Sequence, residues 1–588
     1  MEKFVFPGSF DPIQNGHVDL LQKLVELYPE SEIIIAIGEN YDKRPDFTVK
    51  ERKEMIRRAI SVHPKLQRVK IDSYKGSLSG YAYKNMATVV RGIRDNRDYY
   101  YEKDLITALE SQELGIRTLP LNARDEMSGI RSSFVREYQK SQMSIAKSVH
   151  PYVKQCVEAR ISGQYIIGIT GSSGAGKSHI RREVERIGRE KGFEVIGIDL
   201  DRIPHNMYDG TYKEPIYAEV RRQIVKEFGK EVELPDGKIN RKKLGDIVFN
   251  DPEKLKKLNE IVYTPMMARL RDELYGKRGL FLIDAALAVE LGLTYLSNNN
   301  FILVDADRAT QEKRLKERSL TEEQIRRRLD SQYNTTQKRE ILQREIEKYK
   351  HGTIWEVNNS EGEDLQLDSL FNQIIRQMDM HGELRFVSLW NRLNADGSPY
   401  KVYADLLSAL TEPHRNHHDI NHIVECLDEF ELCKHLMERP NQVELALWFH
   451  EYFYKPRTRV NEEESAKKVY NVCMDARLPE NFALSTKKLV MVTKDHGAQP
   501  LESMDEKCVS DIDLSILGKP QERFDEYDRA IAEEFSWVEP EVYRQNRTHV
   551  LEGFLRRENI YHTGLFRGIY EAQARMNLQR AIDRLRSS

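Results

Sequence analysis

Residues 165–178 read YIIGITGSSGAGKS, an apolar run followed by a glycine-rich stretch. The last eight residues fit the pattern GxxxxGK(S/T), and a helical pattern begins at Lys177. Between a strand and a helix, backbone N–H groups of such a loop cradle phosphates, Lys177 reaches the β- and γ-oxygens, and Ser178 ligates Mg²⁺. The residues predicted to bind ATP here are Gly171, Ser172, Ser173, Gly174, Ala175, Gly176, Lys177 and Ser178.

Further apolar runs around this loop predict a parallel sheet. Residues 193–198, 280–283 and 301–304 each read as a buried strand in strand–helix alternation. The first run leads into Asp199-Leu200-Asp201, where carboxylates can engage Mg²⁺ or an acceptor hydroxyl. The plain alternative for acids at this position is a helix cap.

The N-terminal block repeats the strand–turn–helix–strand order. Residues 4–6 and 33–37 read as strands, with a helical pattern over residues 18–27 between them. The segment GSFDPIQNGH, residues 8–17, lies where the first strand passes into the helix. Unpaired N–H groups and the positive dipole end of a helix suit phosphate at such a place. His17 could donate a hydrogen bond to a phosphoryl oxygen as negative charge builds up.

Three later motifs complete a resemblance. They are a Lys-x-Pro-x-Phe stretch at residues 43–47, an RGxR cluster at 91–94 and an SSxVRE segment at 132–137. With the FDP turn and the GH signature, they make residues 1–155 resemble bacterial-type phosphopantetheine adenylyltransferases. The resemblance implies a Rossmann-like fold and the adenylylation of 4′-phosphopantetheine by ATP with Mg²⁺, which releases pyrophosphate.

The same resemblance implies roles for individual residues. Ser9 and His17 would contact the reacting phosphates, while Lys43 and Arg91 would hold the pantetheine phosphate. Residues expected to contact ATP are Ser9, Phe10, Gly16, Gly92, Arg94, Glu102, Ser132 and Ser133. The family usually has Thr or His three residues before the signature histidine, and this chain has Gln14. An amide can still donate to phosphate, so we expect tuning of the reaction rather than its loss.

A second resemblance covers about residues 163–378. The stretches INRKKLG and LIDAALAVE, with Gln311, Arg314 and Arg318, resemble dephospho-coenzyme A kinase, closest to the kinase half of the eukaryotic coenzyme A synthase. The resemblance implies that Asp201 is the general base for the ribose 3′-hydroxyl and that Arg241 contacts the acceptor. Arg314 and the run Arg326-Arg327-Arg328 would close over ATP; a solvated helix face is the plain alternative for that run.

After about residue 380 the pattern becomes helical, and histidines are frequent. His418 and His422 stand four residues apart, which predicts that both lie on one face of a helix. His450-Glu451 ends an apolar helical pattern, and Asp513 follows later in the chain. Imidazole with carboxylate suits a divalent cation that activates water against phosphate esters.

This order of motifs resembles the HD-superfamily metal-dependent phosphohydrolases over about residues 384–585. The resemblance implies that His422, His450, Glu451 and Asp513 ligate a divalent metal and that His418 is a general acid. The family has aspartate where this chain has Glu451, and the extra methylene moves the carboxylate by more than about 1 Å. An active hydrolase, an inactive metal-binding module and a scaffold therefore all stay open for this block.

Composition excludes several classes of protein. The 588 residues include 91 basic and 94 acidic ones, so the net charge of −3 does not indicate nucleic acid. Five scattered cysteines without a CxxC pair argue against a disulfide framework and suit a reducing compartment. The N-terminus does not read as a signal peptide, and no apolar stretch approaches the roughly 20 residues needed to span a bilayer. We expect a cytoplasmic enzyme without nucleic-acid or membrane partners.

The sequence thus predicts a multidomain chain with two parallel-sheet α/β domains and an all-α domain. These are a Rossmann-like nucleotidyltransferase at residues 1–158, a P-loop kinase at 159–380 and an HD-type helical domain at 381–588. We expect the chain to catalyse the last two steps of coenzyme A biosynthesis, with ATP as substrate and Mg²⁺ as cofactor. Two alternatives are a hydrolase whose N-terminal blocks sense coenzyme A intermediates, and a regulatory protein that binds them without turnover. Channelling and homo-oligomer formation stay open.

Overall fold

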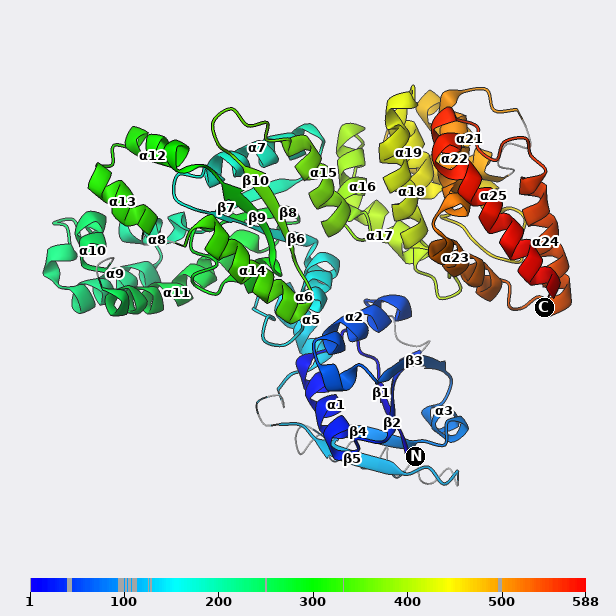
Figure 1. Cartoon of the computed structure of the whole chain (residues 1–588), viewed down its shortest axis with the longest axis horizontal. Helices are drawn as coiled ribbons and strands as arrows, with labels where there is room; N and C mark the ends of the chain where they lie inside the picture. The colour runs from blue at the N-terminus through cyan, green and yellow to red at the C-terminus, as the bar shows by residue number, and fades with distance from the viewer. Residues whose placement is uncertain are drawn as a thin grey trace. The chain divides into compact units, whose positions relative to one another are not determined.

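The computed structural model describes residues 2–39, 45–93, 100, 103, 107, 114–124, 126, 129–248, 251–330, 333–494 and 500–587. The chain divides into two compact units, Met1–Ile187 with Val195–Leu370, and Gly188–Glu194 with Phe371–Ser588. The first unit carries two five-stranded parallel sheets, and the described part of the second is helical (Figure 1). This confirms the predicted fold class, whereas the division at residues 158 and 380 stays a prediction.

The first sheet has the strand order β3-β2-β1-β4-β5, and its neighbouring strands are parallel. Its strands are β1 (Lys3–Gly8), β2 (Glu32–Glu39), β3 (Lys70–Lys75), β4 (Thr88–Ile93) and β5 (Thr118–Asn122). Strand β2 is buried from Ile33 to Ile37, because helices cover both faces of a parallel sheet. The described helices of this part are α1 (Asn15–Leu27), α2 (Val49–Ser61), α3 (Leu78–Lys84), α5 (Ser132–Lys140) and α6 (Pro151–Val157).

The second sheet has the order β10-β9-β6-β8-β7, again with parallel neighbours. Its strands are β6 (Gln164–Gly171), β7 (Val195–Asp199), β8 (Gly279–Asp284), β9 (Asn300–Asp305) and β10 (Thr353–Asn358). Every residue of the central strand β6 is buried. Asp199 and Asp284 are paired in register at the carboxyl ends of β7 and β8. Ligands of open α/β sheets bind at this edge.

Helices surround the second sheet and continue beyond it. They are α7 (Lys177–Glu190), α8 (Arg202–Tyr208), α9 (Pro215–Phe228), α10 (Arg241–Val248), α11 (Pro252–Leu274), α12 (Arg308–Glu317), α13 (Glu322–Asp330) and α14 (Thr335–Tyr349). Helix α15 (Leu367–Met378) begins in the first unit and continues into the second from Phe371. Helix α7 begins directly after the glycine-rich loop, as the sequence predicts. The central strand therefore delivers the loop to the carboxyl edge of the sheet.

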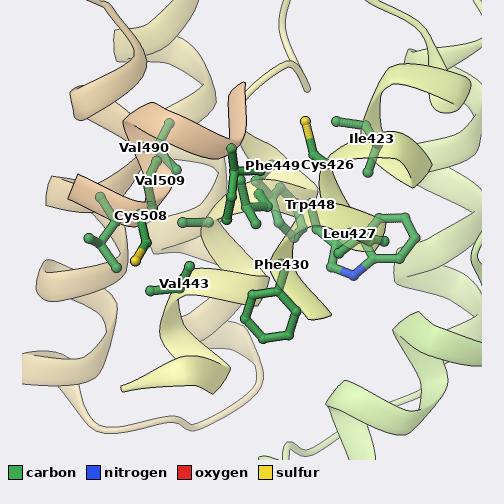
Figure 2. Close-up of a cluster of buried hydrophobic side chains, with 14 of the residues drawn as sticks. Ile423, Cys426, Leu427, Phe430, Val443, Trp448, Phe449, Val490, Cys508 and Val509 are labelled. Atoms are coloured by element: carbon green, nitrogen blue, oxygen red, sulfur yellow. The ribbon is translucent and has the colours of Figure 1, made fainter. Parts of the chain in front are cut away.

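The second unit is built from helices around one apolar core. They are α16 (Glu383–Arg392), α17 (Pro399–Leu410), α18 (Ile420–Cys433), α19 (Pro440–Phe449), α20 (Asn461–Asp475), α21 (Glu480–Met491), α22 (Met504–Asp513), α23 (Gln521–Glu534), α24 (Pro540–Leu555) and α25 (Gly564–Ser587). Figure 2 shows Phe430 of α18, Val443 and Trp448 of α19 and Val509 of α22 in this cluster. Burial of such side chains is the main stabilising contribution to a helical domain.

Among the described residues, no helix combines the length and the apolar character that crossing a bilayer requires.

Candidate functional site

A cavity of about 170 Å³ opens where β1 and β4 end beside the N-terminus of α1. Its lining includes Gly16, His17, Arg91 and Gly92, all of them predicted site residues. A Cβ on Gly92 would lie 2.5 Å from the side chain of Leu20, so glycine keeps β4 close to α1. The structure thus brings His17 together with Arg91, which lies 74 positions later in the sequence.

Hydrogen bonds at the start of α1 determine how His17 faces this cavity. The backbone N–H of Gln14 donates to Nδ1 of His17 at 3.3 Å. In the neutral imidazole, a nitrogen that accepts leaves the proton on the other nitrogen. Nε2 of His17 is therefore the donor, as a phosphate ligand requires.

Gln14 itself has a structural task. Its side-chain oxygen accepts the N–H of Gly16, which caps α1, and its Nε2 donates to the carbonyl of Ile130 at 3.1 Å. Only 2% of Gln14 is exposed. One of the two N–H groups of the Gln14 amide is bonded to Ile130, and Gln14 also lines the cavity, so its expected contact with phosphate stays a prediction.

Ser9 and Ser132, two further predicted residues of the first site, make hydrogen bonds at the FDP turn. The carbonyl of Ser9 accepts from Arg52 at 2.7 Å, and the hydroxyl of Ser132 donates to the carbonyl of Pro12 at 2.8 Å. The ring of Phe10 lies edge-on to His17, with centroids 5.0 Å apart. Ser133 is exposed on the first turn of α5. Lys43, Arg94 and Glu102 lie outside the described residues.

The second site is the phosphate-binding loop. Gly171, Gly174 and Gly176 all have positive φ angles, 151°, 82° and 93°. A Cβ on Gly171 would lie 2.1 Å from the carbonyl oxygen of Val304, so this position requires glycine. The Nζ atom of Lys177 donates to the carbonyls of Gly171 and Ser172 at 3.1 and 3.3 Å. Lys177 thus lies over the loop whose bound phosphates it is predicted to contact.

Asp284 is a site residue that our sequence-based list of ligands omitted. It ends β8, only 2% of it is exposed, and its Oδ2 accepts the hydroxyl proton of Ser178 at 2.8 Å. Burial raises the pKa of Asp284, and Lys177 and Ser178 oppose that shift. The available signal was the acid at the end of the apolar run LFLID. Hydroxyl and carboxylate oxygens are the ligands that Mg²⁺ prefers.

Asp201 lies beside the same edge of the sheet. Its Oδ2 accepts the backbone N–H of Ala286 at 2.9 Å. Burial raises the pKa of Asp201 to about 6. Its side chain makes no capping hydrogen bond to α8. Asp199 instead accepts the backbone N–H of Arg202, the first residue of α8, at 3.0 Å, so the helix-cap alternative holds for Asp199 and not for Asp201. A carboxylate with a pKa near neutrality is suited to general-base work.

A buried ion pair supports the loop that faces Asp201. Lys338 has no exposed surface, and its Nζ donates to the carbonyl of Ala286 and to Glu290, each at 2.6 Å. Desolvation lowers the pKa of Lys338, while Glu290 opposes that shift. Lys338 and Glu290 therefore position the N–H that Asp201 accepts.

The predicted arginines have different neighbours. Arg314 donates to the carbonyls of Gly174 and Ala175 at 3.3 and 3.1 Å, so it supports the phosphate loop. Arg241 lies 2.9 Å from Nε2 of His205. Arg326 lies on the exposed part of α13, and the side chains of residues 327 and 328 lie outside the described part. A cavity of about 230 Å³ beside the loop is lined by Ser172, Ser173, Asp305, Arg308, Gln311 and Thr335, among others.

The third candidate site is a buried cluster in the second unit. Nε2 of His422 lies 3.2 Å from Nε2 of His450 and 3.1 Å from Oδ1 of Asp513. His450 lies 3.5 Å from the same carboxylate oxygen. The ligands of a tetrahedral metal centre are about 3.3–3.8 Å apart, given bonds of about 2.0–2.3 Å. The three distances lie within about 0.2 Å of that range. The donors therefore have nearly the spacing, and the chemistry, that a divalent cation needs.

Two details of this cluster differ from the sequence-based expectation. Helix α18 begins at Ile420, with Asp419 as its N-cap, so His418 and His422 do not share a helix face. The prediction was wrong because Asp419 accepts the N–H groups of the first turn and His418 precedes the helix. The group of four donors within 4.8 Å of one another includes Cys426 with His422, His450 and Asp513, and it does not include Glu451.

Glu534 holds His418 beside the cluster, and sequence reasoning missed it. Its Oε2 accepts from Nδ1 of His418 at 2.6 Å and from the hydroxyl of Tyr454 at 2.7 Å. Burial opposes the charged form of His418, but Glu451 and Glu534 raise its pKa above the ordinary value. A histidine that keeps its proton is suited to act as a general acid. No motif links residue 534 to residue 418, which lies 116 positions earlier.

The first two sites define a nucleotide-dependent transferase, with one nucleotidyl-transfer domain and one P-loop kinase domain. Residues 5–138 match the cytidylyltransferase-like family, and residues 165–348 match the dephospho-CoA kinase family. The phosphopantetheine adenylyltransferase of Shouchella clausii is 37% identical over 150 residues, which are 25% of this chain and 91% of that protein. The chain belongs to the phosphopantetheine adenylyltransferase family.

The chain is also similar to two further proteins. The phosphopantetheine adenylyltransferase of Carboxydothermus hydrogenoformans is 38% identical over 136 residues, 23% of this chain and 80% of that protein. The solved dephospho-CoA kinase of Campylobacter jejuni is 22% identical, with 37% of this chain and 97% of that chain covered and a TM-score of 0.22. The adenylyltransferase and kinase domains together indicate the last two steps of coenzyme A biosynthesis.

Proposed function

We propose that the cavity at α1 and the phosphate loop at α7 are the active sites of two successive transfers. In the first, 4′-phosphopantetheine takes the adenylyl group of ATP. In the second, the ribose 3′-hydroxyl of dephospho-coenzyme A takes a phosphoryl group. The observation that carries the proposal is convergence: His17 and Arg91 meet at one cavity, and Lys177, Ser178 and Asp284 meet at one sheet edge.

In the first transfer, a phosphate oxygen of 4′-phosphopantetheine forms a bond to the α-phosphorus of ATP, and the bond to pyrophosphate breaks. His17 donates from Nε2 to the phosphates, and Arg91 offsets their negative charge. The resemblance adds Ser9, Lys43, Arg94 and Glu102 as binding residues. No side chain acts as nucleophile, so rate comes from positioning and charge neutralisation.

In the second transfer, Asp201 takes the proton of the 3′-hydroxyl as its oxygen bonds to the γ-phosphorus, and ADP leaves. Lys177 binds the β- and γ-phosphates, and Arg241 contacts the acceptor. Ser178 and Asp284 would hold Mg²⁺, which offsets the charge of the phosphates. The burial of Asp201 supports its role, because a raised pKa lets a carboxylate accept a proton more readily.

For the second unit we propose a metal-dependent phosphohydrolase. His422, His450 and Asp513 would hold a divalent cation, which supplies electrophilic activation of a phosphate ester and of water. His418, oriented by Glu534, would give a proton to the leaving group. An inactive metal-binding module and a scaffold are the alternatives. They need to be tested because this chain has Glu451 where the resembled family has aspartate.

The decisive experiment is a mass-resolved assay of the purified chain with 4′-phosphopantetheine, ATP and Mg²⁺. Coenzyme A that accumulates by way of dephospho-coenzyme A supports both transfers. Stable binding of the substrates without an adenylylated product overturns the proposal and favours a sensing or regulatory role. The second unit is tested in parallel with p-nitrophenyl phosphate and a nucleotide panel, with His418→Ala as the control.

A further inference from the structure

Cys426 lies in the proposed metal centre of the second unit. It follows His422 by four residues on α18, and its Sγ is 3.7 Å from Nε2 of His422. Only 1% of Cys426 is exposed. Figure 2 shows its sulfur at the edge of the apolar cluster, pointing away from the ring of Phe430. The sulfur therefore lies at the edge of the core, in contact with the imidazole of His422.

A buried cysteine is often only a small apolar side chain. Cys433, seven residues further along α18, fits that description, because its sulfur contacts the carbonyls of Glu429 and Phe430 in its own helix. Cys426 differs because it is one of four mutually close donors, with His422, His450 and Asp513. The two cysteines lie on the same helix and both are buried. What distinguishes Cys426 from Cys433 is therefore its place beside the other three donors.

Glu451 does not belong to the group of four, although the resemblance assigns it as a ligand. Two imidazoles and one carboxylate leave one position of a four-coordinate site to be filled. We propose that the thiolate of Cys426 is the fourth ligand of this centre. On binding, the S–H bond breaks, a metal–sulfur bond forms and the proton passes to solvent. The inference rests on the proposed metal centre, but not on hydrolysis.

A thiolate changes which cation the centre prefers. Soft sulfur ligands favour zinc and similar ions, whereas carboxylates and water suit magnesium and manganese. We therefore expect the centre to retain zinc in the presence of excess Mg²⁺. Metal analysis of the full chain, dialysed against Mg²⁺ with trace Zn²⁺, measures this preference directly.

Cobalt is the probe for the ligand itself. The full chain is stripped of metal with a chelator and then titrated with Co²⁺ in the absence of nucleotide. Co²⁺ bound at the phosphate loop would give no thiolate band, because residues 171–178 contain no cysteine. We expect about one equivalent of bound Co²⁺ and a near-ultraviolet thiolate-to-cobalt charge-transfer band. Cys426→Ser should abolish the band and weaken Co²⁺ binding by more than about 100-fold, beyond the range of outer-sphere substitutions. Cys433→Ser, the matched control, should retain both.

Each outcome separates the ligand from the centre. Co²⁺ that binds to one equivalent without the band, and equally in Cys426→Ser, overturns the role of Cys426 and leaves the metal centre standing. No bound Co²⁺ in the unaltered chain overturns both. Circular dichroism shows whether each variant is folded. A second variant, Cys426→Ala, tests the same ligand, and a folded Cys426→Ala variant that binds Co²⁺ as tightly as the native chain would also contradict the inference. His450→Ala should lose binding altogether.

Discussion

The hydroxyl of Ser178 donates to Asp284 across 2.8 Å, which joins the first turn of α7 to the end of β8. The two groups are 106 residues apart in the sequence. In the proposed kinase reaction the same two oxygens would hold Mg²⁺. The pair therefore connects the sequence motif with a carboxylate that the motif does not contain.

Asp284→Asn should reduce the kinase step by at least about 100-fold in kcat, because an amide oxygen is a weaker ligand for Mg²⁺ and leaves its charge uncompensated. Formation of dephospho-coenzyme A should not change, and it is the internal control. The measurement is steady-state phosphorylation of dephospho-coenzyme A over a range of Mg²⁺ concentrations. Full activity at low Mg²⁺ would remove Asp284 from the site.

His17→Ala should reduce adenylylation by about 10²–10³-fold, the effect of losing one preorganised donor to the transition state. The variant should still phosphorylate added dephospho-coenzyme A. Lys177→Ala is the reciprocal control: it should stop phosphorylation and let dephospho-coenzyme A accumulate. If either variant lost both activities, the two sites would not be independent.

The kinase step should depend on the ionisation of Asp201. Asp201 accepts a proton only as the carboxylate, and burial raises its pKa to about 6. The value of kcat/KM should therefore fall about tenfold for each pH unit below 6, since that constant reports the free enzyme. Asp201→Asn should have low residual activity without this acid limb. The same limb in the variant would assign the ionisation to another group.

Glu534→Gln should loosen the segment that precedes α18. Glu534 accepts the backbone N–H groups of residues 416–418, and replacing a charged acceptor should lower the local opening free energy by about 1–3 kcal/mol. Hydrogen exchange of peptides over residues 410–425 measures this change. Glu533→Gln, an exposed neighbour, is the matched control and should have no effect.

The pH dependence of that difference has a defined sign. Burial opposes the charge of Glu534, yet bonds from His418, the N–H of His417 and Tyr454 lower its pKa to about 2. A depressed carboxyl pKa contributes stability above the unfolded value and loses it as the pH falls towards the folded value. The pKa of His418 is raised above its ordinary value of 6.5, so the stability from the charged pair is complete only where Glu534 is ionised and His418 is protonated. The difference between the native chain and Glu534→Gln should therefore be largest between about pH 4.5 and 6.5 and shrink between about pH 4.5 and 2. A difference that grew below about pH 4.5 would contradict this account.

Much of the fold could be read from local patterns. Apolar runs such as residues 33–37 became buried parallel strands, and the loop at residues 171–178 joins β6 to α7 as expected. These features depend on hydrogen bonds and side-chain periodicity within a few residues. The wrong prediction for His418 also concerned only a few residues. The spacing of four between His418 and His422 suggested one helix face, but Asp419 caps α18, so the helix begins after His418.

The sequence by itself determined the two sheets, the phosphate loop and the histidine motifs after residue 380. Each of these features is encoded by residues that are adjacent in the chain. Only the tertiary structure decided that Asp284 meets Ser178, that Glu534 holds His418, and that Cys426 takes a place among the donors where Glu451 was expected. The first two pairings span more than 100 residues. Such contacts depend on how helices and strands pack, and no local periodicity encodes that packing.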